Sequence, residues 1–282
     1  MTILKKHAAK LPGYFLVILW TVFTFFVIGW VILASFSTTR DIFSANMIAG
    51  FFEDGLQFNN YVRAWVDNHV QVYFFNSVLY TFSALFGVIF ISSPAAYALS
   101  RFAFKGNSTL QSLFVASMGV PVVMIIMPLF SLFSYLQLTN TRWLLIILYI
   151  CINIPFTVFF LIAFFRNIST TFEEAASIDG CGPIRTFWLI MMPLAQPGII
   201  TVSIFNFINI WNEYFMALIF ATRMDLRPIA VGLFTMVQGM RYIGDWAGVF
   251  AAVVIVFLPT FILYIFLSEK IIAGVTGGAI KG

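Results

Sequence analysis

The chain has 282 residues, of which 61% are hydrophobic and 9% charged, with a mean hydropathy of +0.99 and a net charge of +4. Water-soluble domains are about 45–50% apolar and about 25% charged, so this composition excludes an ordinary soluble domain. Basic residues this sparse in an apolar chain set membrane topology and do not indicate a nucleic-acid partner. The two cysteines form neither a disulfide framework nor a metal-ligand spacing.

Six apolar runs are each long enough to cross a bilayer core of roughly 30 Å, which takes about 20 residues of helix. They cover residues 14–36, 73–99, 110–136, 143–165, 198–220 and 248–267. The first run is too long for the apolar part of a signal peptide, so we interpret it as a retained span. Polar stretches over 37–72 and 221–247 separate some of the runs. The sequence therefore predicts an all-α integral membrane bundle of six transmembrane helices.

The basic residues favour an orientation with both termini in the cytoplasm. In this orientation nine basic residues lie inside and six outside, and the opposite orientation would reverse the tally. The inside residues are Lys5, Lys6, Lys10, Arg101, Lys105, Arg166, Arg185, Lys270 and Lys281. The outside residues are Arg40, Arg63, Arg142, Arg223, Arg227 and Arg241. The same orientation places the connection at about residues 169–195 in the cytoplasm.

That connection contains EEAASIDGCG, Glu173 to Gly182, which concentrates three carboxylates in an otherwise apolar chain. Capping residue types at 169–171 precede good helix formers, and acidic residues in a first turn suit the helix dipole. Gly180 is placed to end this helix and Pro183 to open a second. The spacing predicts a helix-turn-helix, in which Ala175 and Ala176 leave a surface that another protein can approach closely. An ordinary charged loop is the alternative.

Glu174-Ala175-Ala176, then Gly180 after three residues, and then Ile190 and Met192-Pro193 resemble the EAA loop of ABC importer permeases, with Met192 in place of a leucine. MPLFSLFSYLQLTNT (127–141), IPFTVFFLIAFFRNI (154–168), WNEYFMAL (211–218) and GVTGGAIKG (274–282) are similar to MalG-like carbohydrate permeases. The resemblance covers nearly the whole chain and is weakest over 37–72. Residues 169–171 depart from it, because the family often has a proline-containing cap there.

This resemblance implies the type I ABC importer permease fold, with the helix-turn-helix as a coupling helix seated in a cleft of a cytoplasmic ATPase subunit. The coupling residues that it implies are Glu174, Ala175, Ala176, Asp179, Gly180, Ile190 and Pro193. It also implies a C-terminal tail, at 277–282, that reaches toward the ATPase dimer interface. Residues 1–72 would hold the N-terminus, first span and external segment, residues 73–268 the permease core, and residues 269–282 the tail.

The partners that the resemblance implies are a homologous second permease, two ATPase subunits and an extracytoplasmic solute-binding protein. The expected location is the bacterial cytoplasmic membrane. The implied substrate is a sugar, in particular an oligosaccharide. The alternative is a permease for glycerol phosphate esters, which near relatives carry, or for another small polar solute. The sequence has no P-loop, no HExxH and no paired catalytic carboxylates, so we assign it no catalytic, cofactor-binding or metal-binding residues. ATP and Mg²⁺ are expected on the partner ATPases.

The fifth apolar run carries a polar stripe, because Asn206, Asn209 and Glu213 fall at i, i+3 and i+7 on one helix face. Such groups are unfavourable against lipid, so the stripe should face the bundle interior or a water-filled path. The candidate translocation residues are Asn206, Asn209, Trp211, Asn212, Glu213 and Tyr214, with Asn76 and Asn153 as possible additions. Interhelical hydrogen bonding is the alternative for the amides, and structural pairing is an equal alternative for Glu213.

Two other functional classes stay open. A secondary transporter would carry an ionisable coupling residue deep in a span, and here only Glu213, near a span end, comes close. An intramembrane enzyme would need nucleophilic, acidic or metal-binding groups at membrane depth, and no such cluster is evident. Co-purification with an ATPase would separate these classes from an importer.

Overall fold

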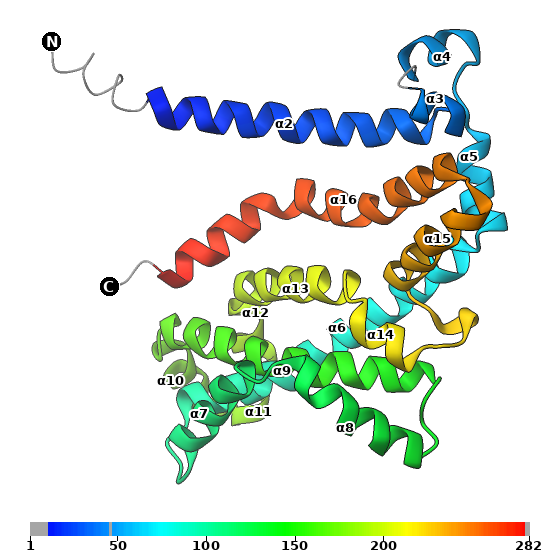
Figure 1. Ribbon diagram of the computed structural model, residues 1–282. Helices are drawn as coiled ribbons and strands as arrows, with labels where there is room; N and C mark the ends of the chain where they lie inside the picture. The colour runs from blue at the N-terminus through cyan, green and yellow to red at the C-terminus, as the bar shows by residue number, and fades with distance from the viewer. Residues whose placement is uncertain (1–10, 45–46, 280–282) are drawn as a thin grey trace, which may run out of the picture. The chain divides into compact units, whose positions relative to one another are not determined.

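The computed structural model describes residues 11–44 and 47–279, apart from the side chains of residues 11, 12, 241 and 269–279. In this part of the chain the regular secondary structure is helical throughout (Figure 1). Four helices are long and apolar enough to cross a membrane: α2 (Leu11–Ser35), α6 (Val70–Arg101), α9 (Arg142–Asn167) and α16 (Trp246–Ala279). Counting each of two bent helix pairs as one span raises the number to six. The prediction of an all-α membrane fold is confirmed.

The third apolar run forms two helices instead of one. α7 (Asn107–Met118) and α8 (Val122–Tyr135) meet at an angle of 96°. Pro121, at the break, has extended backbone angles, with φ −64° and ψ 128°. Proline lacks an N–H donor and disfavours a helical conformation in the residue before it. The run expected over 110–136 is therefore not one continuous helix.

The fifth run is also broken. The arm made of α11 (Pro183–Thr186), the π-helical segment η2 (Phe187–Met191) and α12 (Met192–Leu194) meets α13 (Gln196–Trp211) at 74°. A separate helix, α14 (Phe215–Phe220), follows. The Glu213 carboxylate accepts the N–H groups of Met216 and Ala217 at 2.7 and 3.2 Å, so it caps α14 as a new helix. The continuous helix expected over 198–220 is therefore wrong beyond Trp211.

The chain divides into two compact units, of which the first comprises residues 1–71 and 233–258. Besides α2, this unit contains four short helical segments: α3 (Thr39–Phe43), α4 (Met47–Glu53), α5 (Asn59–Val62) and η1 (Arg63–Asp67). The buried Asn60 donates to the carbonyl oxygens of Ser35 and Ser37, each at 2.9 Å. Arg63 forms an ion pair with Asp245 at 3.2 Å. The polar stretch after the first span is therefore folded onto the end of α2.

The second unit comprises residues 72–232 and 259–282 and contains the residues assigned to function. Its helix α9 has 11 buried residues and packs against α7 and α13. The approach to α13 is close, because a Cβ atom built on Gly198 would lie 2.5 Å from the ring of Phe164. Small residues allow such close packing in membranes, where the contact itself stabilises the helix pair.

The polar stretch expected over 221–247 is largely helical, because it includes α15 (Ile229–Ile243). Residues 221–228, with the short η3 (Met224–Leu226), form a loop, and the non-helical Gly244 and Asp245 separate α15 from α16. Asn76 donates to the carbonyl oxygens of Asp225 and Arg227 at 2.8 and 3.1 Å. Asn76 thus holds this loop and does not belong to the polar stripe.

Candidate functional site

The helix-turn-helix predicted around Gly180 is present, and we call residues 169–195 the bracket. It starts with α10 (Thr171–Ile178), and Pro183 stands at the first turn of α11, as predicted. Ser169 provides the start of α10, since its hydroxyl oxygen accepts the N–H of Thr171 at 3.3 Å. Thr170 makes no side-chain capping bond.

Gly180 ends α10 with a positive φ of +72°. The N–H of Cys181 donates to the carbonyl of Ala176 at 2.8 Å, and the N–H of Gly180 donates to that of Ser177 at 3.1 Å. This pair of bonds defines a Schellman motif, which satisfies carbonyls that the helix end leaves without partners. A residue with a Cβ atom is disfavoured at this φ, so the prediction that Gly180 ends this helix is confirmed.

Most of the predicted coupling residues on the bracket are exposed: Glu174, Ala175, Asp179, Gly180 and Pro193. Two large apolar side chains beside the turn, Ile178 and Ile184, are 86% and 78% exposed. Ile190 is half-buried and packs against the core cluster that includes Phe165 and Met191. The bracket therefore combines a solvent-facing acidic and apolar surface with an arm anchored in the core.

Ala176 differs from the expectation, because it is only 3% exposed. Successive residues of an α-helix are rotated by about 100°, so neighbouring alanines of α10 face different directions. Only Ala175 can contribute to a surface that another protein approaches. Ala176 instead packs within its own chain.

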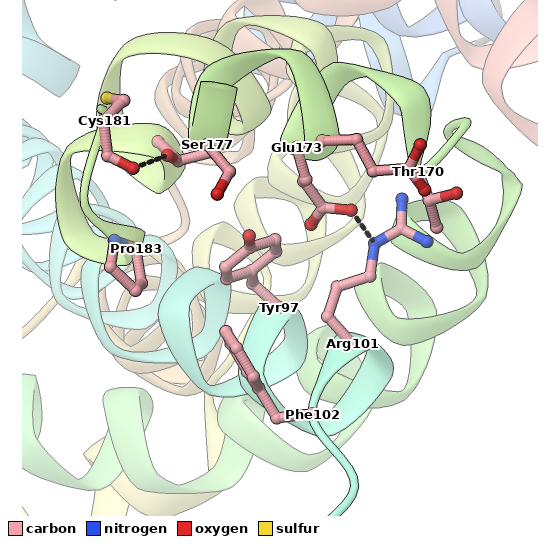
Figure 2. A pocket seen from close by; sticks show the side chains of 10 residues that line it. Tyr97, Arg101, Phe102, Thr170, Glu173, Ser177, Cys181 and Pro183 are labelled. Carbon is pink, nitrogen blue, oxygen red and sulfur yellow. Dashed lines mark hydrogen bonds and ion pairs between the residues drawn. The ribbon is translucent and has the colours of Figure 1, made fainter. Parts of the chain in front are cut away.

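A cavity of about 410 Å³ lies beside the bracket (Figure 2). It is lined by residues of α6 and of the bracket, among them Tyr97, Arg101, Glu173, Ser177, Cys181 and Thr186. The Nε atom of Arg101 lies 3.2 Å from Glu173 Oε2, and Figure 2 shows these side chains pointing toward each other. The sequence did not identify this pair, since Arg101 counted only toward topology.

Asn206 and Asn209 of the polar stripe lie on α13 and bond to α9, whereas Glu213 lies beyond the end of α13, so the three do not share one helix face as expected. Asn206 Nδ2 donates to Thr157 Oγ1 at 2.9 Å, and Asn209 Nδ2 donates to Asn153 Oδ1 at 2.8 Å. Asn206 is only 1% exposed, which matches the alternative of interhelical hydrogen bonding. Asn153 joins the stripe, as suggested.

The other stripe residues differ in exposure. Trp211 is 2% exposed and stacks on Phe207, with ring centroids 5.6 Å apart and planes 8° apart. Asn209, Asn212 and Tyr214 are exposed. These three are the candidate residues most accessible to a solute, and their place in a translocation pathway stays a prediction.

Glu213 has structural partners at both carboxylate oxygens. Besides capping α14, it accepts the Tyr149 hydroxyl at 2.9 Å. Tyr149 and Thr157 were not identified from the sequence, although they lie four residues before and four residues after Asn153. Residues four apart share a helix face, so this spacing was the signal that could have found them.

Residues 280–282 of the tail expected at 277–282 lie outside the described residues, and so do all of residues 1–10.

Comparisons with known proteins agree with this geometry. Residues 87–271 match the family described as binding-protein-dependent transport system inner membrane component. The chain is 35% identical to the diacetylchitobiose uptake system permease protein NgcG of Streptomyces coelicolor, over 94% of this chain and 87% of that relative. It is 31% identical to the trehalose/maltose transport system permease protein MalG of Thermococcus litoralis, with 94% of each covered.

The fold also resembles a chain in a crystal structure of a bacterial ABC transporter involved in the import of the acidic polysaccharide alginate. The TM-score is 0.76 at 22% identity, covering 92% of this chain and 96% of that one. One conclusion follows from the family match, from the relatives that match nearly the whole chain and from the shared fold. The chain belongs to the binding-protein-dependent transport system inner membrane component family, and it is a multi-pass permease subunit of an ABC transporter.

Proposed function

We infer that this permease imports a disaccharide or short oligosaccharide that a solute-binding protein delivers. Support comes from the relatives named for diacetylchitobiose uptake and for trehalose/maltose transport, which this chain matches over nearly its whole length. The exposed amides of Asn209 on α13 and of Asn212, directly after this helix, and the ring of Tyr214 suit a solute with hydroxyl groups and an apolar ring face.

The working assembly contains a second, homologous permease and two ATPase subunits, which bind ATP and Mg²⁺. This chain has the non-catalytic role of converting ATPase closure into movement of its helices. Alternating access would open the cavity outward when ATP closes the ATPases and inward afterwards. The bracket lies on the cytoplasmic side in this arrangement, and both termini lie there as well.

The observation that carries the proposal is the exposed surface of the bracket. Glu174, Ile178 and Ile184 present a carboxylate and two large apolar groups next to a turn of fixed geometry. Exposed apolar side chains rimmed by polar groups are typical of protein interaction sites. A short rigid connection, anchored at both ends in spans, suits the transfer of a rigid-body rotation into the bundle.

Reconstitution of the purified complex into proteoliposomes tests this function. Labelled disaccharides, added with the binding protein, should accumulate only when ATP is supplied on the side of the ATPase subunits. Mass spectrometry of the ligand that co-purifies with the binding protein would identify the sugar. Accumulation without the ATPase subunits would contradict an ATP-driven importer. A non-saccharide ligand on the binding protein would contradict the substrate class alone.

A further inference from the structure

We propose that Arg101 is a positioning residue that ties the coupling helix α10 to the end of α6. This inference rests on the proposed function, because it assigns a route by which movement of the bracket reaches a membrane span. Arg101 is the last residue of the 32-residue helix α6. Its side chain is 11% exposed, and that of its partner Glu173 is 20% exposed. The ion pair is therefore largely shielded from solvent, unlike surface pairs, which contribute little.

Arg101 contacts two elements at once. Its Nε atom lies 3.2 Å from Glu173 Oε2 in the first turn of α10, and Figure 2 shows this pair beside the cavity. Its Nη2 atom donates to the carbonyl oxygen of Ile168 at 2.5 Å, where Ile168 caps the end of α9. The Nη2 contact is a hydrogen bond, whereas the Nε contact with Glu173 is an ion pair without hydrogen-bond geometry. A guanidinium can make both contacts at the same time because its charge and its donors are spread over a planar fork, which the single ammonium group of a lysine does not offer. One side chain thus joins the end of α6, the end of α9 and the start of the bracket.

Aromatic packing holds the same junction one turn earlier in α6. The ring of Tyr97 packs on Phe165 of α9 at a centroid distance of 5.6 Å and on Phe187 of η2 at 5.1 Å. Phe165 and Phe187 are buried, so these contacts are part of the core. The second arm of the bracket is therefore attached to α6 and α9 through apolar contacts, and the first arm through Arg101.

The two adjacent glutamates of α10 have different surroundings. Glu173 is paired with Arg101, whereas Glu174 is exposed and forms no ion pair within the described residues. The assignment follows from this difference: Glu173 fastens the helix to its own chain, and Glu174 stays available to a partner subunit. Loss of Arg101 should leave α10 able to meet the ATPase, yet poorly connected to α6.

The experiment uses the complete complex in proteoliposomes and compares Arg101→Gln, Glu173→Gln, the double variant and Arg101→Lys. The measured quantity is solute imported per ATP hydrolysed, with assembly followed by co-purification of all subunits. Arg101→Gln should lower this ratio at least about fivefold, the lower end of ordinary coupling between sites. Glu173→Gln should act in the same direction. The double variant should lower the ratio no further than the more severe single variant does, because either substitution alone already breaks the ion pair between Arg101 and Glu173.

Arg101→Lys should recover part of the ratio, because it keeps the charge opposite Glu173. Arg166→Gln is the matched control: this exposed arginine lies in the last turn of α9 and bonds Gln111, so its loss should leave the ratio unchanged. An unchanged ratio in Arg101→Gln, or additive losses in the double variant, would overturn the proposal. If Arg101→Gln does not assemble, the ratio of imported solute to hydrolysed ATP is compared in Glu173→Gln and Arg101→Lys. An unchanged ratio in Glu173→Gln would then overturn the proposal. A wild-type complex without ATP-driven uptake would instead refute the proposed function.

Discussion

Tyr149 donates its hydroxyl to the carboxylate of Glu213 across 2.9 Å, and so connects α9 to the point where the fifth apolar run breaks. The same carboxylate caps α14 through the N–H groups of Met216 and Ala217. Tyr149 is only 1% exposed, so its hydroxyl has no ready access to water as an alternative partner. Glu213 therefore specifies both where the new helix begins and how it is attached to α9.

Replacement of Glu213 by alanine should destabilise the protein. It removes the α14 cap, a change that costs about 1 kcal/mol, and leaves the Tyr149 hydroxyl unpaired, which costs about 1–3 kcal/mol more. The thermal unfolding midpoint of the detergent-purified complex should fall. Tyr149→Phe removes only one of these bonds and should lower the midpoint less. An equal midpoint for Glu213→Ala and the wild type would contradict the capping role.

A bulky residue at Gly180 should uncouple ATP hydrolysis from transport while the protein still inserts and assembles. The positive φ of Gly180 disfavours any residue with a Cβ atom, by roughly 1–2 kcal/mol, so Gly180→Trp distorts the turn between the two arms. Gly182→Trp is the matched control, because Gly182 is exposed, has a φ of −71° and has open space around its Cβ position. Uptake and ATPase activity are measured on the same liposomes. Undiminished uptake by well-expressed Gly180→Trp would count heavily against the coupling role.

Charge reversal at Glu174 should also uncouple the complex, but by weakening the contact with the ATPase. Glu174 is exposed and has no ion pair within the described part of the chain, so Glu174→Lys should not lower the stability of this subunit. Co-purification of the ATPase subunits with the permease should be weaker than for the wild type at low salt and should fall less as the salt concentration rises, because a repulsion that salt screens replaces an attraction that salt weakens. An identical salt dependence would exclude Glu174 from the contact.

The buried amide of Asn206 on α13 and the exposed amide of Asn212, directly after this helix, should respond differently to alanine substitution. Asn206→Ala removes a buried bond to Thr157, so the unfolding midpoint should fall by an amount corresponding to about 0.6 kcal/mol, typical for such bonds in membranes. Asn212→Ala removes an exposed group and should leave stability unchanged. If Asn212 lines the pathway, its loss should lower uptake at equal ATPase activity. Normal uptake by both Asn209→Ala and Asn212→Ala would remove these amides from the pathway.

Gly198 should tolerate no side chain at the α9–α13 contact. The Cβ atom of Gly198→Ala would lie 2.5 Å from the ring of Phe164, and overpacking of this kind costs about 1–3 kcal/mol. Gly239→Ala is the comparison, since the nearest atom to its Cβ position is an ordinary 3.7 Å away. The unfolding midpoint should decrease for the first variant only. A stable Gly198→Ala protein would indicate that the two helices can move apart at no cost.

The bracket could be predicted from sequence because its determinants are local. Gly180 ends α10 through its own backbone freedom, and Pro183 opens α11 because it needs no N–H partner there. Neither effect depends on residues far along the chain. The number of apolar runs could be predicted for a similar reason, since length and hydropathy suffice to identify a possible span.

The breaks within the spans could not be predicted from hydropathy alone. Pro128 lies inside α8, whereas Pro121 lies at the 96° bend, although both are prolines in one apolar run. The partners of the polar groups were equally hidden, because Arg101 and Glu173 are far apart in the sequence. The inward direction of Ala176 depends on which side of α10 meets the core, and no local signal specifies that side.

The number of residues between the end of α9 and Glu173 determines which residues of α10 face Arg101 and the interior. Between Ile168, which ends α9, and Glu173 there are only four residues, so the chain has no slack to absorb an insertion or deletion. Deleting one of them would rotate every later position of α10 by about 100°. Glu174 would then occupy the place opposite Arg101, and Ser177 would replace Ala176 in the interior. Substitutions at 169–171 should therefore be accepted far more readily than any change in their number.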